Sequence, residues 1–99
     1  MESLGFCGRG EGASKSGSGA WNLDGEVAVS PSGGTLCTNP IGVTGLVRAI
    51  DAANQIMGKS GANQVKGVKN ALATAIGGST QFFTCTLLGD DHVAGRHAA

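Results

Sequence analysis

The chain has 99 residues, and its seven Lys and Arg residues balance its seven Asp and Glu residues, so its formal net charge is zero. That length predicts a single domain. A neutral chain lacks the electrostatic footprint of proteins that bind nucleic acids or acidic membranes. Its apolar runs are far shorter than the roughly 20 residues of a membrane span. No basic segment precedes an apolar one in residues 1–30, so we expect no secretion signal.

The cysteine and glycine contents restrict the class further. Cys7, Cys37 and Cys85 are odd in number and widely spaced, which argues against a disulfide framework or metal site and favours a reducing, cytoplasmic setting. Each is most simply a small buried hydrophobe. Eighteen glycines, with only one Trp and three Phe, leave few large side chains for a core. We therefore expect the chain to depend on a larger domain or on a partner.

Residues 1–25 are predicted to be a glycine-rich loop segment. The stretch "GEGASKS" resembles a phosphate loop, but Ser14 stands where that motif needs Gly before the Lys, and no apolar strand precedes it. Residues 26–30 alternate in polarity, with Val27 and Val29 on one face, which predicts a short strand. Pro31 ends this strand or places it at an edge.

A helix of about four turns is predicted from residue 43 to Gly58, which occupies the usual C-terminal glycine position. Arg48 and Asp51 are three residues apart and are expected to pair. Steps of three and four residues form one apolar stripe, made of Val43, Leu46, Val47, Ile50, Ala53, Ile56 and Met57.

Residues 70–76 and 80–88 are predicted to form a hairpin around Gly77, Gly78 and Ser79. Both faces of the second run carry apolar side chains, which favours a sheet covered on both sides. The helical crossover implies that the first two strands are parallel, so the fold class is α/β. Residues 26–89 thus form the predicted structured unit, and residues 90–99, with His92 and His97, are expected to be a disordered tail.

Four blocks, in this order, carry a family resemblance: "GFCGRGEGASKSGSG", "VAVSPSGGTLCTNPIGVTGLVRAI", "GANQVKG" and "ATAIGGSTQ". Together they resemble the last quarter of a thiolase, nearest to the sterol-carrier or lipid-transfer type, over about residues 3–88. The resemblance implies a partial thiolase-like fold. In it, the chain supplies a strand–helix–strand–strand unit of a five-stranded mixed sheet, with strands from earlier sequence lying between the first two.

In that family the block after Gly-Gly ends in Gly-His-Pro, and the His positions the thioester oxygen and helps to activate the nucleophile. Here Asn39 precedes Pro40, in a segment about one residue shorter. An amide can donate a hydrogen bond to a developing oxyanion, but it cannot take up a proton near neutral pH. Asn before Pro is equally a common turn initiator, so both interpretations of Asn39 stay open.

A second family motif, Cys-x-Gly, corresponds here to Ala75, Ile76 and Gly77. Ala75 has no acid–base capacity, whereas the backbone amide of Gly77 can form half of an oxyanion hole. The family's acyl-carrying cysteine lies in earlier sequence that this chain lacks. Cys37 is in the Asn39 loop, but no His accompanies it there, and a small packed side chain is the preferred interpretation.

The resemblance implies an acyl-CoA substrate, no covalently bound cofactor, and a homo-oligomer or a small partner protein. We therefore expect the C-terminal portion of a lipid-transfer-type thiolase-like protein, with condensing chemistry altered or lost, in fatty acid or steroid side-chain metabolism. Relatives that cleave by retro-aldol chemistry use tyrosines, which this chain lacks. The isolated chain should be inactive. The alternatives are a non-catalytic module that completes a sheet in a partner or homodimer, and a degenerate fragment.

Overall fold

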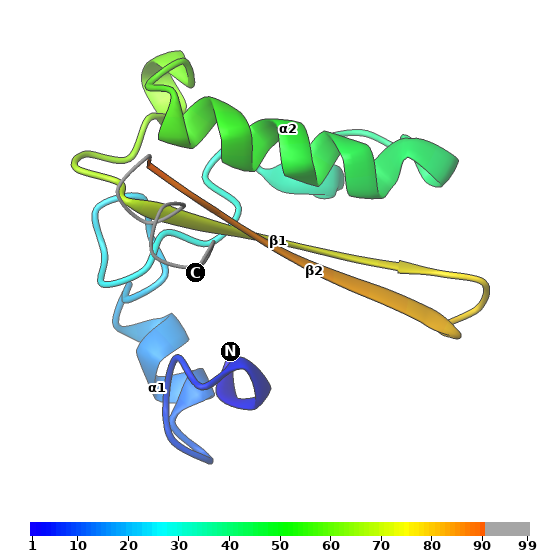
Figure 1. The fold of residues 1–99 in the computed structure, drawn as a ribbon. Coiled ribbons are helices and arrows are strands. Elements are labelled where there is room, and N and C mark those ends of the chain that lie inside the picture. Colours follow the sequence, from blue (N-terminus) through cyan, green and yellow to red (C-terminus); the bar gives the residue numbers. More distant parts are fainter. Residues whose placement is uncertain (91–99) are drawn as a thin grey trace, which may run out of the picture.

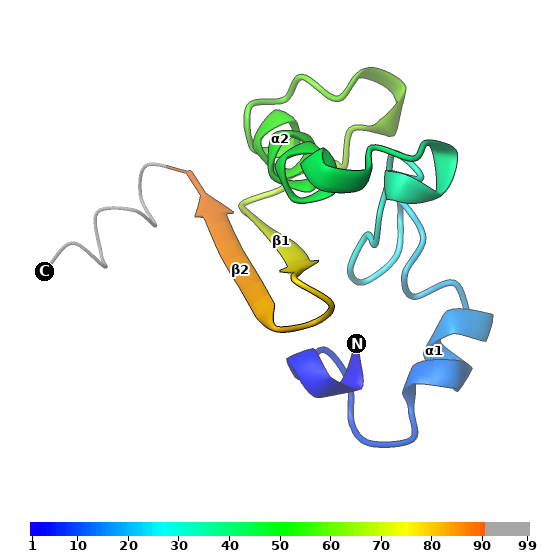
Figure 2. The same cartoon turned by 90° about the vertical axis from the view of Figure 1, so that its right-hand side faces the viewer.

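The computed structural model describes residues 1–90, so the predicted tail, with both histidines, lies outside the described residues. The mixed α/β class is confirmed: a helix α2 lies across a two-stranded hairpin, and a short helix α1 lies apart from them (Figures 1 and 2). The helices and strands are α1 (Gly12–Gly17), α2 (Thr44–Ile56), β1 (Asn70–Gly77) and β2 (Phe82–Gly89). Short 3-10 helices occupy Glu2–Leu4, Gly34–Cys37, Ile41–Val43 and Gly61–Asn63.

The predicted helix is confirmed, and its end has a clear physical cause. Gly58 has φ +68°, a left-handed conformation that glycine adopts without steric cost. The Lys59 amide donates to the Asn54 carbonyl at 2.8 Å, so an otherwise unpaired carbonyl of the last turn is satisfied.

The face of α2 that meets the hairpin is made of small and polar residues. Gly45, Arg48, Ala52 and Gln55 share this face by their spacing, and Ala52 and Gln55 are buried. A Cβ added at Gly45 would lie 2.8 Å from the Cβ of Ala75, so the helix backbone approaches β1 closely. Most of the predicted apolar stripe faces outward instead, and its exposed members are Val43, Leu46, Ile50 and Met57.

The predicted hairpin is confirmed as well. β1 and β2 pair antiparallel from Asn70 opposite Gly89 to Gly77 opposite Phe82, and residues 78–81 form the turn. We expected both faces of the sheet to be covered, but most side chains of β2 stay exposed within residues 1–90. Phe82 and Phe83 point to opposite faces of the sheet, yet each is 69% exposed.

The expected strand at residues 26–30 was wrong for the isolated chain, because this segment forms bends. The amides of Val27 and Val29 donate to the carbonyls of Ala20 and Trp21, each at 3.1 Å. A strand needs a neighbour along its edge, and this segment is hydrogen-bonded to Ala20 and Trp21 and not to β1 or β2. The five-stranded sheet therefore stays a prediction. Helix α1 also lies within residues 1–25, which were predicted to be a loop.

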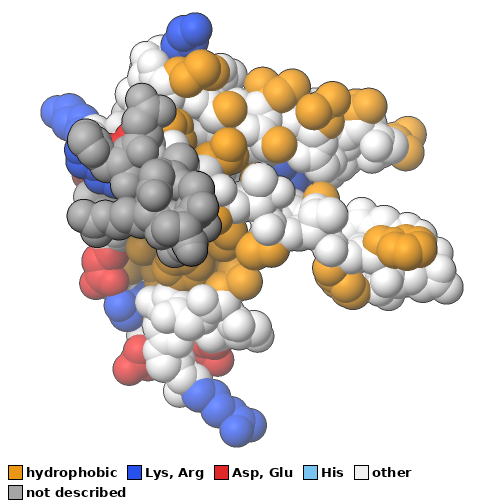
Figure 3. All heavy atoms as spheres, in the orientation of Figure 1, with side chains coloured by type: hydrophobic (Ala, Val, Ile, Leu, Met, Phe, Trp, Pro, Cys, Tyr) orange, Lys and Arg blue, Asp and Glu red, His pale blue; other side chains and the backbone are white. Residues whose placement is uncertain are grey.

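The core of the described residues is small. Its buried members are Ala20, Ala52, Ala73 and Gln55, and no large side chain of residues 1–90 is fully buried. Hydrophobic side chains gather instead on the outer surface of α2 and at the protruding hairpin (Figure 3). None of the helices within residues 1–90 is long and apolar enough to cross a membrane.

Candidate functional site

The loop that carries the first family motif is fixed to α2 by Ser32. The Ser32 hydroxyl donates to the Asp51 carboxylate at 2.8 Å, and it accepts a hydrogen bond from the Gly34 amide at 3.1 Å. Gly33 and Gly34 have φ +87° and +58°, which suits glycine and turns the chain sharply into the 3-10 helix Gly34–Cys37. The Gly-Gly turn expected from the sequence is therefore present and anchored.

Asn39 lies on the exposed surface immediately before the segment that leads into α2. Thr38 is extended, Pro40 caps the 3-10 helix Ile41–Val43, and α2 begins at Thr44. Within residues 1–90 no hydrogen bond holds the Asn39 side chain, which is exposed. Ile41, two residues after Asn39, has φ +43°, which is a strained backbone conformation for a β-branched residue.

The structure brings the two motif-bearing segments to one end of the fold. Helix α2 and strand β1 run in opposite directions, so the start of the helix and the end of the strand lie at the same end (Figure 1). The contact between Gly45 and Ala75 joins them. Gly77 is the last residue of β1 and is exposed. No hydrogen bond joins Asn39 to Gly77 in the described residues, so their joint role stays a prediction.

Cys37 lies in the same loop without a group that would activate it. It is exposed, as is Cys85, and Cys7 is half-buried, so the expectation of buried cysteines was wrong. The Cys37 thiol lies 3.9 Å from the Ser32 carbonyl, and a Cβ at Gly33 would collide with its sulfur. The thiol thus packs over the glycine turn. Among residues 1–90 no His, Cys, Asp or Glu cluster could hold a metal ion.

Two contacts of α2 were not expected from the sequence. The predicted pair between Arg48 and Asp51 is not formed, because each side chain has a more distant partner. Arg48 donates to the Thr74 carbonyl at 2.7 Å and so ties the helix to β1. Both partners are far away in sequence, and the spacing within the helix gave no signal for either contact.

Gln55 was also missed, although it anchors the loop that carries the "GANQVKG" block. Its side-chain amide donates to the Asn63 carbonyl at 2.7 Å, and its carbonyl oxygen accepts from the Val65 amide at 2.9 Å. The Gln64 side chain donates in return to the Gln55 backbone carbonyl at 2.9 Å. The "GANQVKG" block therefore closes the C-terminal end of α2, away from the Asn39 end.

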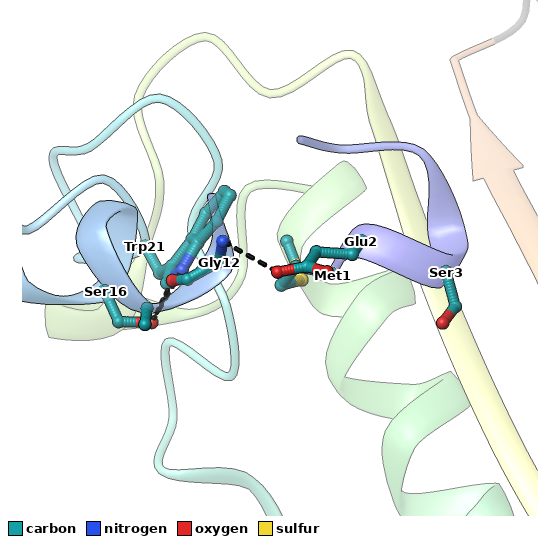
Figure 4. A pocket seen from close by; sticks show the side chains of 7 residues that line it. Met1, Glu2, Ser3, Gly12, Ser16 and Trp21 are labelled. Carbon is teal, nitrogen blue, oxygen red and sulfur yellow. Dashed lines mark hydrogen bonds between the residues drawn. The ribbon is translucent and has the colours of Figure 1, made fainter. Parts of the chain in front are cut away.

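An open hollow of about 360 Å³ lies at the N-terminal segment, between the first 3-10 helix and α1 (Figure 4). Its polar groups are engaged with one another: the Gly12 amide donates to Glu2 at 2.9 Å, and the Trp21 indole donates to Ser16 at 3.0 Å. The backbone amides of Gly10 and Gly12 lower the pKa of the Glu2 carboxyl. These contacts hold the segment together.

Comparisons with known proteins agree with the resemblance. The family model described as "Thiolase C-terminal domain-like" matches residues 1–90. An acetyl-CoA acetyltransferase of Methanothermobacter thermautotrophicus is 36% identical over 80 residues, which are 80% of this chain and 21% of that protein. Human sterol carrier protein 2 is 36% identical over 77% of this chain and 14% of its own length. The non-specific lipid-transfer protein-like 2 of Caenorhabditis elegans is 35% identical over 77% of this chain and 19% of its own length.

The chain thus spans about a fifth or less of the length of these relatives. The family model, in contrast, covers every residue that the structure describes. The chain belongs to the thiolase C-terminal domain-like family.

Proposed function

We propose that the chain is the C-terminal portion of a lipid-transfer-type thiolase-like protein that acts on acyl-CoA thioesters with altered condensing chemistry. The observation that carries the proposal is the exposed Asn39 in an anchored loop at the start of α2. In the thiolases that this chain resembles, a His occupies the position of Asn39. Replacing imidazole by an amide keeps a hydrogen-bond donor for a thioester oxygen and removes a proton acceptor.

In this proposal Asn39 and Gly77 act as donors and not as acid–base groups. The Asn39 amide would orient the thioester carbonyl, and the Gly77 backbone amide would supply the second donor. The contact of Gly45 with Ala75 supports this arrangement, because it fixes the start of α2 against the strand that ends in Gly77. Cys37 has no base beside it, so we assign it no role.

Calorimetric titration of the whole chain tests this role. We expect an acyl-CoA to bind several-fold more tightly than free CoA, without turnover. Asn39→Ala should remove that preference, because it deletes the donor to the carbonyl. Thr38→Ala is the matched control, since Thr38 is the exposed neighbour in the same loop, and it should keep the preference. Turnover by the chain alone that Asn39→Ala abolishes would contradict the proposal, as would equal binding of both ligands.

A second candidate, a module that completes a sheet in a partner or homodimer, is favoured by the hairpin. Two paired strands leave two free edges, which are ready templates for further strands. The exposed Phe82 and Phe83 would be covered by such an extension. If the sheet extends between copies, hydrogen exchange of β2 amides should slow as protein concentration rises. Exchange that is independent of concentration would exclude pairing between copies.

A further inference from the structure

The Asp51 side chain is spaced to pair with Arg48 on α2, yet it binds the motif loop instead. Its carboxylate accepts a hydrogen bond from the Ser32 hydroxyl at 2.8 Å. The same hydroxyl accepts a hydrogen bond from the Gly34 amide at 3.1 Å, so Ser32 both closes the glycine turn and attaches it to the helix. Hydrogen bonds to a carboxylate are stronger than those between neutral groups, which makes this a firm attachment.

This contact tethers one end of the loop that carries Asn39. The loop leaves α2 at Ser32 and returns at Thr44, where the helix begins. Asp51 lies about 10 Å along the helix axis from Thr44, since each helical residue rises about 1.5 Å. Between these two points the 3-10 helix Gly34–Cys37 lies beside α2 (Figures 1 and 2). Both ends of the loop are therefore fixed to the same helix, one by the backbone and one by the tether.

The backbone on both sides of Asn39 is folded into short turns. Before it, the Thr38 amide donates to the Thr35 carbonyl at 3.4 Å. After it, the Val43 amide donates to the Pro40 carbonyl at 3.0 Å. A proline also restricts the backbone of the residue that precedes it, which here is Asn39. The position of the Asn39 side chain therefore follows the position of the loop, and the tether sets that position.

We propose that Asp51 is a positioning residue, which acts through Ser32 to hold the Asn39 amide in place for a thioester carbonyl. The inference rests on the proposed function of Asn39 and adds a residue outside the quoted family blocks. Asp51 itself does not touch the ligand. A donor that is already held in place loses less freedom on binding. The tether should therefore strengthen the binding of an acyl-CoA more than that of free CoA, which lacks the thioester carbonyl.

Calorimetric titration of the full chain tests this role through the ratio of acyl-CoA affinity to CoA affinity. Asp51→Ala should lower the ratio several-fold, because it removes the acceptor for Ser32. Asp51→Asn should retain the ratio, because its side-chain oxygen still accepts the hydrogen bond. When Asn39→Ala is already present, Asp51→Ala should change the ratio no further. An equal loss of affinity for both ligands, or the same loss of the ratio with and without Asn39, would overturn the proposal.

NMR relaxation of the Asn39 side-chain amide tests the tether without any ligand. Asp51→Ala should lower its order parameter, and Asp51→Asn should not. Gln55→Leu is the matched control, because it removes hydrogen bonds at the opposite end of α2. It should leave the order parameter unchanged below the unfolding transition.

The two measurements separate this inference from the proposed function. If the wild type binds both ligands equally while Asp51→Ala still loosens Asn39, the proposed function fails and the hold of Asp51 on Asn39 stands. An unchanged Asn39 order parameter in Asp51→Ala would overturn the positioning role, whatever the chain binds.

Discussion

Single residues hold this small fold together mainly through polar contacts to the backbone. Gln55 is 7% exposed, and both ends of its side-chain amide are hydrogen-bonded to the loop at residues 63–65. A buried polar group costs free energy when it loses its partner, so a residue of this kind is more sensitive than most exposed apolar side chains. Ser32 and Arg48 serve the same purpose at the other contacts of α2.

We predict that Gln55→Leu lowers the free energy of unfolding by about 2–4 kcal/mol, because the Asn63 carbonyl and the Val65 amide both lose their partner. Hydrogen exchange of the Val65 amide should accelerate more than that of the β1 amides. Gln81→Leu is the matched control, because Gln81 is exposed in the hairpin turn. If both variants unfold at the same denaturant concentration, Gln55 does not anchor the loop.

We predict that protonation of the Glu2 carboxyl at low pH loosens the N-terminal segment. Backbone amides of Gly10 and Gly12 lower its pKa below 4.5, so its stabilising contribution is complete above pH 4.5 and is lost as pH falls through the lower, folded-state pKa. Trp21 lines the same hollow, and its fluorescence should report this loss as pH is lowered below about 4.5. Glu2→Gln should abolish the transition. Asp24→Asn, at an exposed position, should retain it.

The pKa of Lys15 is shifted in the opposite direction to that of Glu2. The hydrogen bond to Glu26, at 2.7 Å, raises the Lys15 pKa above 10.5. The contribution of Lys15 to stability is therefore fully present below pH 10.5 and is lost as pH rises through the raised pKa. The ion pair lies at the surface, so its contribution to stability is small.

The sequence predicted which loop and strand end to inspect, but not the residues that fix them. Asn39 and Gly77 were chosen because they match positions in the motifs of the family that the chain resembles, and the loop around Asn39 does form at the start of α2. Ser32, Arg48 and Gln55 were missed because their partners lie 8 to 26 residues away. Periodicity describes neighbours within one helix, and such distant contacts depend on how the elements meet.

At the scale of elements, the packing of α2 on β1 depends on a missing side chain. Gly45 lets the helix backbone approach the Cβ of Ala75. We predict that Gly45→Ala destabilises the chain by about 1–3 kcal/mol, although alanine favours helices, because the added methyl group overpacks this contact. Thermal or chemical denaturation measures the effect.

A second substitution separates overpacking from helix propensity. Gly45→Ala combined with Ala75→Gly should recover part of the loss, because the methyl group then moves from one side of the contact to the other. Gly42→Ala is the control in open space, and it should change stability little. Equal effects of Gly42→Ala and Gly45→Ala would contradict close packing of α2 on the strand.

Elements with local causes were predictable, and elements with distant causes were not. Helix α2 has its apolar repeat and Gly58, and the hairpin has two β-rich runs around a Gly-Gly turn. Val27 and Val29 have the alternation of a strand, but a strand exists only beside another strand. The direction of the apolar stripe of α2 was unpredictable for the same reason, because the helix carries two usable faces and only the tertiary contact selects one.

The whole molecule is held together by little buried apolar surface. Its radius of gyration is 14.3 Å, compared with about 13 Å for a compact domain of 100 residues. Large apolar side chains stay exposed on α2 and on the hairpin. Such a chain gains more from covering these surfaces than from its own interior, and its stability should be linked to association.

We therefore predict that the midpoint of thermal unfolding rises with protein concentration, since association stabilises only the folded copies. The transition of the dilute chain should be broad, and the exposed apolar surface should bind a hydrophobic dye. Leu46→Glu should reduce the concentration dependence, because it places a charge on the exposed apolar face of α2. A sharp, concentration-independent melt of a monomer would show instead that the described core suffices, and that the exposed faces of α2 and the hairpin need no cover.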